Sequence, residues 1–177
     1  MDLRVKKTRS SIINAFLQLR AKKPLERITV KELADLAEIN KATFYLHYKD
    51  IYDLSETLEN ELFERAFNSI EHPNSVLTEP GLFIREFGGA MIANKSLIDI
   101  IFGDDRRNIL ADKFETEVRR FILMNNPQYS DSPKINIILT YMIKGSYFAY
   151  AENVKYGLDM VVSVIEEIAE GVVELLK

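Results

Sequence analysis

Ten residues near the start of the chain, NKATFYLHYK at 40–49, bring together side chains that could bind a ligand. They include two lysines, a threonine, a histidine and three aromatic rings. Ammonium and hydroxyl groups bind phosphate oxygens, and threonine or apolar side chains can contact the edges of bases. The composition of this stretch therefore indicates a surface for a polyanion, if the surrounding elements hold these groups outward.

Other kinds of chemistry have little support in the sequence. The only two histidines, His47 and His72, lie far apart, and the chain has no cysteine and no glycine-rich phosphate loop. Two pairs of adjacent carboxylates are typical of a solvated face rather than of an acid–base pair: Asp104 with Asp105, and Glu166 with Glu167. We therefore expect no enzymatic activity, no metal site and no cofactor.

The charge of the chain is unevenly distributed. Residues 1–49 hold eleven Lys and Arg against five Asp and Glu, a balance of +6, whereas the rest holds 12 against 22, a balance of −10. A basic head on an acidic body fits a head that meets a polyanion. No run of about 18 apolar residues is present, so we expect no membrane span, and the absence of cysteine fits a cytoplasmic location.

The elements that must position these side chains are helices, because no segment shows the alternation of a strand. We predict an all-α fold of about nine helices at 5–22, 30–37, 41–46, 51–71, 80–93, 95–102, 106–125, 133–156 and 158–176. The pair Gly88-Gly89 predicts a bend within the fifth. Ser132 is the expected N-cap of the eighth helix, Pro133 its first residue and Gly157 its end.

The first domain is predicted to be a helix-turn-helix at 1–50, with 51–71 as the connecting helix and 72–177 as a second domain. Thr29 and Glu32 have the spacing of a capping box, and Asn40 and Asp50 are suitable N-caps for the two helices that follow. Two helices this short, separated by three residues, need longer flanking helices to bury their faces. The second helix of such a motif enters the major groove of DNA.

The orientation of the 41–46 helix follows from its angular positions of about 100° per residue. Phe44 and Tyr48 share one face and are expected to point inward. The outward residues have no evident core to fill: Ala42, Thr43, Tyr45 and Leu46. The alternative is that Tyr45 and His47 merely complete a small core.

The stretch ITVKELADLAEINKATFYLHYKDIYDLSETL resembles the TetR/AcrR-type bacterial transcription regulators, and the resemblance extends over residues 5–70. It includes the TVKELA and FYLHYK segments and the acidic, leucine-containing start of the fourth helix. The resemblance implies DNA contacts through residues that match the family's motif: Thr29, Lys41, Thr43, Tyr45, His47 and Lys49. Among these, Lys49 would lie near a phosphate and Thr29 would contact the DNA backbone. With the outward Ala42 and Leu46 they form the expected interface.

Two positions depart from the family's pattern. Glu38 stands where the turn usually has glycine, which implies a non-glycine residue at positive φ. Ile51 stands where the family has a phosphate-binding lysine. Either Lys49 or the basic start of the first helix, which holds Lys6, Lys7 and Arg9, would replace that contact.

The resemblance implies that the second domain binds a small effector and dimerises through its last two helices. The residues support the dimer, because the helices at 133–156 and 158–176 are too apolar for both to be covered in one small body; burial of both inside a monomer is the alternative. The position of a ligand pocket stays unknown from the sequence. The second domain has large apolar residues at helical spacing, which are more typical of a core than of a pocket: Phe83, Phe87, Met91, Phe102, Phe114, Phe121, Met124, Tyr141 and Phe148. Lys144 either extends to solvent, which we favour, or faces an anionic ligand.

From the sequence we therefore expect a sequence-specific DNA-binding transcriptional repressor that acts as a homodimer on a palindromic operator. A small molecule is the expected releasing signal. The alternative is a DNA-binding protein whose second domain recruits a protein partner and has no small-molecule effector.

Overall fold

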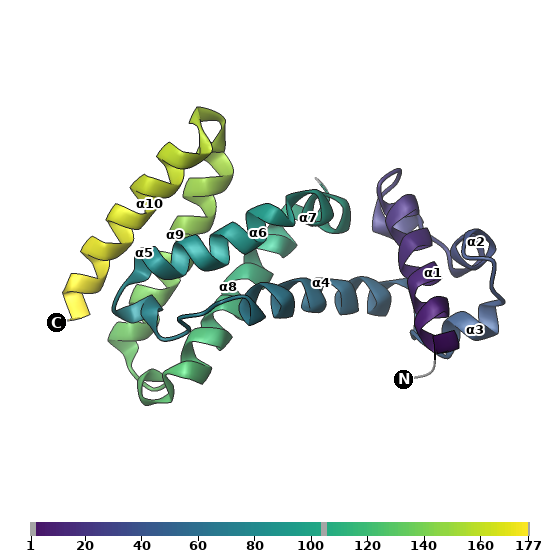
Figure 1. Cartoon of the computed structure of the whole chain (residues 1–177), viewed down its shortest axis with the longest axis horizontal. Helices are drawn as coiled ribbons and strands as arrows, with labels where there is room; N and C mark the ends of the chain where they lie inside the picture. Colours follow the sequence, from purple (N-terminus) through teal and green to yellow (C-terminus); the bar gives the residue numbers. More distant parts are fainter. Residues whose placement is uncertain (1–2, 104–105, 177) are drawn as a thin grey trace. The chain divides into compact units, whose positions relative to one another are not determined.

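The computed structural model describes residues 3–103 and 106–176, and over these residues the fold is all-α, with helices and no strand (Figure 1). Nine helical segments result when 80–93 is counted as one, which confirms the predicted fold class. Asp104 and Asp105, interpreted above as a solvated pair, lie outside the described residues. No helix in the described ranges is long and apolar enough to cross a membrane.

The N-terminal helices begin and end close to the predicted residues. They are α1 (Leu3–Arg20), α2 (Val30–Leu36), α3 (Lys41–Tyr45) and α4 (Ile51–Asn68). The Thr29 hydroxyl accepts the backbone N–H of Glu32 at 3.2 Å, and the Asp50 carboxylate accepts that of Asp53 at 2.8 Å. Asn40 occupies the N-cap position of α3 but caps it through its backbone carbonyl, which accepts the N–H of Thr43 at 2.9 Å, rather than through its side chain.

The later helices also follow the predicted pattern, with one irregular region. They are α5 (Pro80–Phe83), α6 (Gly89–Ala93), α7 (Lys95–Phe102), α8 (Arg107–Asn125), α9 (Pro133–Asn153) and α10 (Leu158–Val173). A wide π turn at Ile84–Gly88 joins α5 to α6. The π turn ends at Gly88, so the irregularity falls at the predicted glycine pair, although Gly88 and Gly89 have ordinary helical φ values of −60° and −58°. Ser132 caps α9, and Gly157 precedes α10 at φ 113°.

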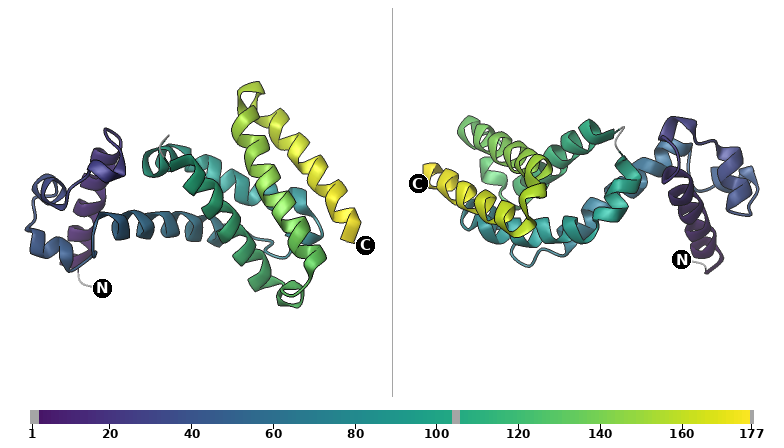
Figure 2. Two further views of the ribbon diagram at one scale, coloured as in Figure 1. Left: turned by 180° about the vertical axis from the view of Figure 1, so that it is seen from behind. Right: turned by 90° about the horizontal axis from the view of Figure 1, so that it is seen from above.

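The chain forms two compact units whose bounds differ from the simple division at residues 50 and 72. The first unit comprises Met1–Leu62 together with Lys95–Arg106, and the second comprises Phe63–Asn94 together with Arg107–Lys177. Helix α7 thus belongs with the N-terminal helices. In the second unit, α9 and α10 lie side by side as a helical hairpin, as two further views show (Figure 2).

Each unit buries its own apolar side chains. In the first unit Phe16, Leu33 and Phe44 are fully buried, together with Phe102 of α7. Phe102 was a candidate for the second domain, and its place in the first unit corrects that assignment. In the second unit the core contains Ile122 of α8, Leu139 of α9 and Val161, Ile165, Ala169 and Val173 of α10.

Candidate nucleic-acid interface

Helix α3 is oriented as its sequence predicts. Phe44 has an exposed fraction of 0% and Tyr48 of 5%, whereas Tyr45 is 56% and Leu46 is 85% exposed. The Tyr45 and Phe44 rings pack edge to face, with centroids 5.6 Å apart at 84°. This contact anchors Tyr45 while more than half of the residue stays exposed, and the alternative in which Tyr45 completes a core is wrong.

The remaining predicted contact residues also lie at or near the surface of the first unit. Six of the eight are exposed: Thr29, Lys41, Ala42, Tyr45, Leu46 and Lys49. Thr43 and His47 are partly buried. The Thr29 hydroxyl accepts a backbone N–H in the α2 cap and keeps its own proton to donate, since a hydroxyl can do both.

The turn between α2 and α3 has the backbone that the missing glycine implied. Glu38 has φ 55°, and it is the one non-glycine residue at positive φ in the described part of the chain. This left-handed conformation costs a residue with a side chain of the order of 1 kcal/mol. The Glu38 carboxylate lines an open hollow of about 510 Å³ with Arg4 and Thr8 of α1, Asp35 of α2 and Thr43 of α3. The two carboxylates in this hollow offset the positive charge of Arg4, so the hollow is not a simple phosphate pocket.

The start of α4 is organised by a buried isoleucine and two carboxylates rather than by a cation. Ile51 is 5% exposed and serves as a core residue. The Asp53 carboxylate accepts the backbone N–H of Lys49 at 2.8 Å, while Asp50 accepts that of Asp53. Two carboxylates therefore occupy the N-terminus of α4, which leaves it unsuited to a phosphate. Tyr52, beside them, is 56% exposed.

The basic start of α1 holds both exposed lysines and an arginine engaged in an ion pair. Lys6 and Lys7 are exposed, but Arg9 forms an ion pair with Glu61 of α4. The hydrogen bond to Glu61 raises the pKa of Arg9. The buried Tyr48 phenol lies near this pair, and burial raises its pKa while the Arg9 charge opposes the increase. Arg9 thus ties α1 to α4, and it does not fit the role of a replacement phosphate contact.

A buried polar network attaches α7 and Arg106 to the helices of the first unit. Arg20 of α1 is 5% exposed and donates to the carbonyl oxygens of Ile101 at 3.2 Å and Phe102 at 2.9 Å, at the C-terminus of α7. Arg106 donates to the Glu59 carboxylate at 2.7 Å and to the Ser55 hydroxyl at 3.0 Å. This network was not predicted from the sequence, because charged residues on a helix are usually exposed.

The helical hairpin of the second unit has two apolar faces. The buried face of α10 carries Ile165. Other large apolar side chains of α10, and Leu175 just after its end, are exposed: Met160 by 61%, Val164 by 45%, Ile168 by 50% and Leu175 by 63%. On α9 the exposed set is Ile137 by 70%, Tyr141 by 63% and Phe148 by 48%. Gly145 and Gly171 lie among these residues, and a Cβ added to either would meet nothing within 4 Å.

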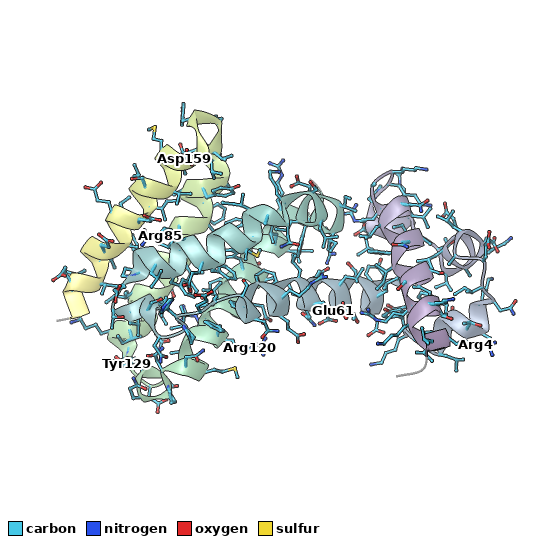
Figure 3. All side chains as sticks on the ribbon, viewed as in Figure 1. Arg4, Glu61, Arg85, Arg120, Tyr129 and Asp159 are labelled. Carbon is cyan, nitrogen blue, oxygen red and sulfur yellow. The ribbon has the colours of Figure 1, made fainter. Side chains whose placement is uncertain are left out.

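The other candidate residues of the second unit divide between core and surface. Phe67 of α4 is stacked between Phe87, with centroids 5.0 Å apart, and Phe121, with centroids 4.5 Å apart. Phe83, Phe87 and Met91 are buried, Phe114 and Phe121 are partly buried, and Met124 is 72% exposed. The Lys144 side chain is 46% exposed and lies 3.9 Å from the Asp112 carboxylate, which agrees with extension to solvent. Arg85, which is labelled in Figure 3, donates a hydrogen bond to Glu166 at 2.8 Å. Glu167 is exposed.

One group of potential metal ligands occurs within the described residues, and it was not predicted from the sequence. Glu71, His72 and Glu86 have ligand atoms that all lie within 4.8 Å of one another. His72 Nδ1 and Glu86 Oε1 are 2.6 Å apart, and Glu86 also accepts the backbone N–H groups of Glu71 and His72 at 3.2 Å. The hydrogen bond with Glu86 raises the pKa of His72, and the same bond lowers the pKa of Glu86. This arrangement closes the segment after α4 onto the π turn.

Comparison of the chain with family models, with curated proteins and with solved structures found no match.

Proposed function

We propose that the protein is a sequence-specific, DNA-binding transcriptional repressor that acts in the cytoplasm as a homodimer. The observation that carries this proposal is the outward face of α3 in a helix-turn-helix. Tyr45 and Leu46 are exposed there with no core to fill, next to the fully buried Phe44. An exposed Leu beside an exposed Tyr on a short helix is explained by a partner that covers both, and the major groove admits a helix.

The charges around α3 support DNA as the partner. Lys41 and Lys49 are exposed on either side of the apolar residues, and Lys6 and Lys7 are exposed near the start of α1. Phosphate contacts from such residues give affinity and orientation, whereas the α3 side chains that reach base edges give specificity. Because Ile51 is buried and two carboxylates cap α4, we assign the main phosphate contact of this region to Lys49.

The exposed apolar face of α9 and α10 supports a homodimer. Scattered apolar residues are normal on a surface, but seven large ones that recur at helical spacing on one hairpin indicate an interaction site: Ile137, Tyr141, Phe148, Met160, Val164, Ile168 and Leu175. Glycine inside a helix costs about 0.8–1 kcal/mol relative to alanine. Since no neighbouring group among the described residues requires Gly145 or Gly171, close approach of a second hairpin explains both. A two-fold dimer would read two half-sites of a palindromic operator.

Release of DNA by a small-molecule effector is the regulatory part of the proposal. We place the binding of an apolar or aromatic compound in the second unit, beside the partly buried rings of Phe114 and Phe121. A second candidate function uses the same exposed hairpin to recruit a different protein. The two are distinguished by light scattering of the purified chain, because a monomer that still binds DNA would favour recruitment.

The experiment that tests DNA binding is selection of bound duplexes from a random pool at fixed salt, followed by affinity measurements over a range of salt concentrations. The wild-type protein should enrich a palindrome. The variant Lys49→Ala should bind it more weakly, with the slope of log K against log salt reduced by about one unit. Lys134→Ala, which removes an exposed lysine of the second unit, is the matched control and should leave the slope unchanged. Enrichment of no duplex would refute the proposed function.

A further inference from the structure

The most exposed large apolar side chain in the described part of the molecule is Leu46, at 85%. It lies immediately after α3 in a right-handed helical conformation, with φ −74° and ψ −20°, and its backbone N–H donates to the Ala42 carbonyl at 3.2 Å. Residues four apart in a helix are neighbours on its surface. Ala42, also exposed, and Leu46 therefore form one apolar strip along the outward face of α3.

The side chains of this strip have no hydrogen-bonding group. A protein usually distinguishes guanine with Arg or Lys and adenine with Asn or Gln, through paired hydrogen bonds in the major groove. Neither Ala42 nor Leu46 can form such bonds, and the exposed Tyr45 beside them carries a single hydroxyl. What an apolar strip can recognise in the major groove is the C5-methyl group of thymine.

We infer that Leu46, with Ala42, selects thymine in each half-site by packing against its C5-methyl group in the major groove. This inference rests on the proposed function and names the chemistry by which that site reads sequence. Exposed lysines precede and follow the strip in the sequence, Lys41 and Lys49, and their charges complement the phosphates that border the groove. Contact with a thymine methyl removes apolar surface of Leu46 from water, which explains why a Leu is tolerated at this exposure.

The test replaces thymine by deoxyuridine, one position at a time, in the duplex selected by the wild-type protein. Deoxyuridine lacks only the C5-methyl group and keeps the pairing edge of thymine. At one or two positions in each half-site, the wild-type protein should bind the substituted duplex about fourfold more weakly, the factor expected for one buried group of this size. Leu46→Ala should bind the thymine and deoxyuridine duplexes with equal affinity.

A matched control comes from α2 of the same unit. Leu36 is also exposed, at 45%, and Leu36→Ala should keep the fourfold preference for thymine. The melting temperature of Leu46→Ala should equal that of the wild type, since the side chain is in solvent. Equal binding of thymine and deoxyuridine duplexes by the wild type would overturn this inference and leave the proposed DNA binding intact. A preference for thymine that persists in Leu46→Ala would also overturn it, whereas enrichment of no duplex would overturn both.

Discussion

Replacing Phe44 by alanine tests the orientation of α3, on which the interface depends. Phe44 has no exposed surface, and its ring contacts those of Tyr45 and Tyr48, with centroids 5.6 and 5.8 Å away. Truncation of a buried Phe to Ala costs about 3–5 kcal/mol. Since whole domains have unfolding free energies of about 5–15 kcal/mol, this loss is a large fraction of the stability of the first unit.

The expected readout is a lower melting temperature. For a domain of about 60–100 residues, 1 kcal/mol shifts the midpoint by about 4–8 °C, so Phe44→Ala should melt at least about 12 °C below the wild type. Far-UV circular dichroism follows the helices as a whole, and the near-UV tyrosine signal reports on Tyr45 and Tyr48. The control is Leu46→Ala on the same helix, whose effect should stay within about 0.5 kcal/mol because Leu46 is in solvent. Similar melting of the two variants would show that the assigned orientation of α3 is wrong.

Three further predictions concern the rest of the molecule. Ile168→Glu places a charge on the exposed face of α10, so the variant should stay folded but scatter light as a monomer. The control Ile165→Glu buries a charge and should instead unfold the chain. If Ile168→Glu remained a dimer, the interface would lie elsewhere. Glu59→Ala removes the buried carboxylate partner of Arg106 and should lower the free energy of unfolding, measured in urea, by about 3–5 kcal/mol. A loss below about 1 kcal/mol would contradict a stabilising role for the Arg106–Glu59 pair. The His72–Glu86 pair should stabilise the protein most between pH 4.5 and 6.5, the ordinary pKa values of the two groups. Because the pKa of His72 is raised, its contribution is lost as pH rises through that higher value, and because the pKa of Glu86 is lowered, its contribution is lost as pH falls through that lower value. The stability difference between the wild type and Glu86→Gln, measured across pH, should therefore peak in this window, and a flat difference would refute the pairing.

Local features of the sequence predicted the N-terminal motif well. Capping by Thr29 and Asp50 depends on residues three positions apart, and the inward position of Phe44 depends on helical periodicity alone. The positive φ of Glu38 followed from the resemblance, because the residue stands where a glycine is usual. These properties are encoded within a few residues, so a single sequence was enough to predict them.

Features that depend on distant residues could not be predicted in this way. Nothing near Arg9 shows that Glu61 will pair with it, and nothing near Arg20 shows that it will cap a helix about eighty residues later. From the sequence, Arg9 was therefore expected to be available to DNA, and Phe102 was expected in the second domain although it lies in the first unit. The sequence also did not predict which apolar residues of α10 are exposed. Ile165 and Ile168 belong to one apolar stripe in the sequence, but the structure buries only Ile165.

Because Lys95–Arg106 belongs to the first unit, that unit is completed late during synthesis and cannot be transferred as one continuous segment. The bond from Arg20 to the Ile101 carbonyl spans 81 positions of the chain, so a nascent polypeptide cannot finish its N-terminal unit until residue 106 has left the ribosome. Until then Arg20 and Glu59 lack these native partners, and the emerging helices expose apolar surface to chaperones. The same reasoning applies to chimeric proteins. A graft that transfers residues 1–62 alone to another scaffold should be unstable, whereas a graft that also carries 95–106 brings with it the segment that completes the fold.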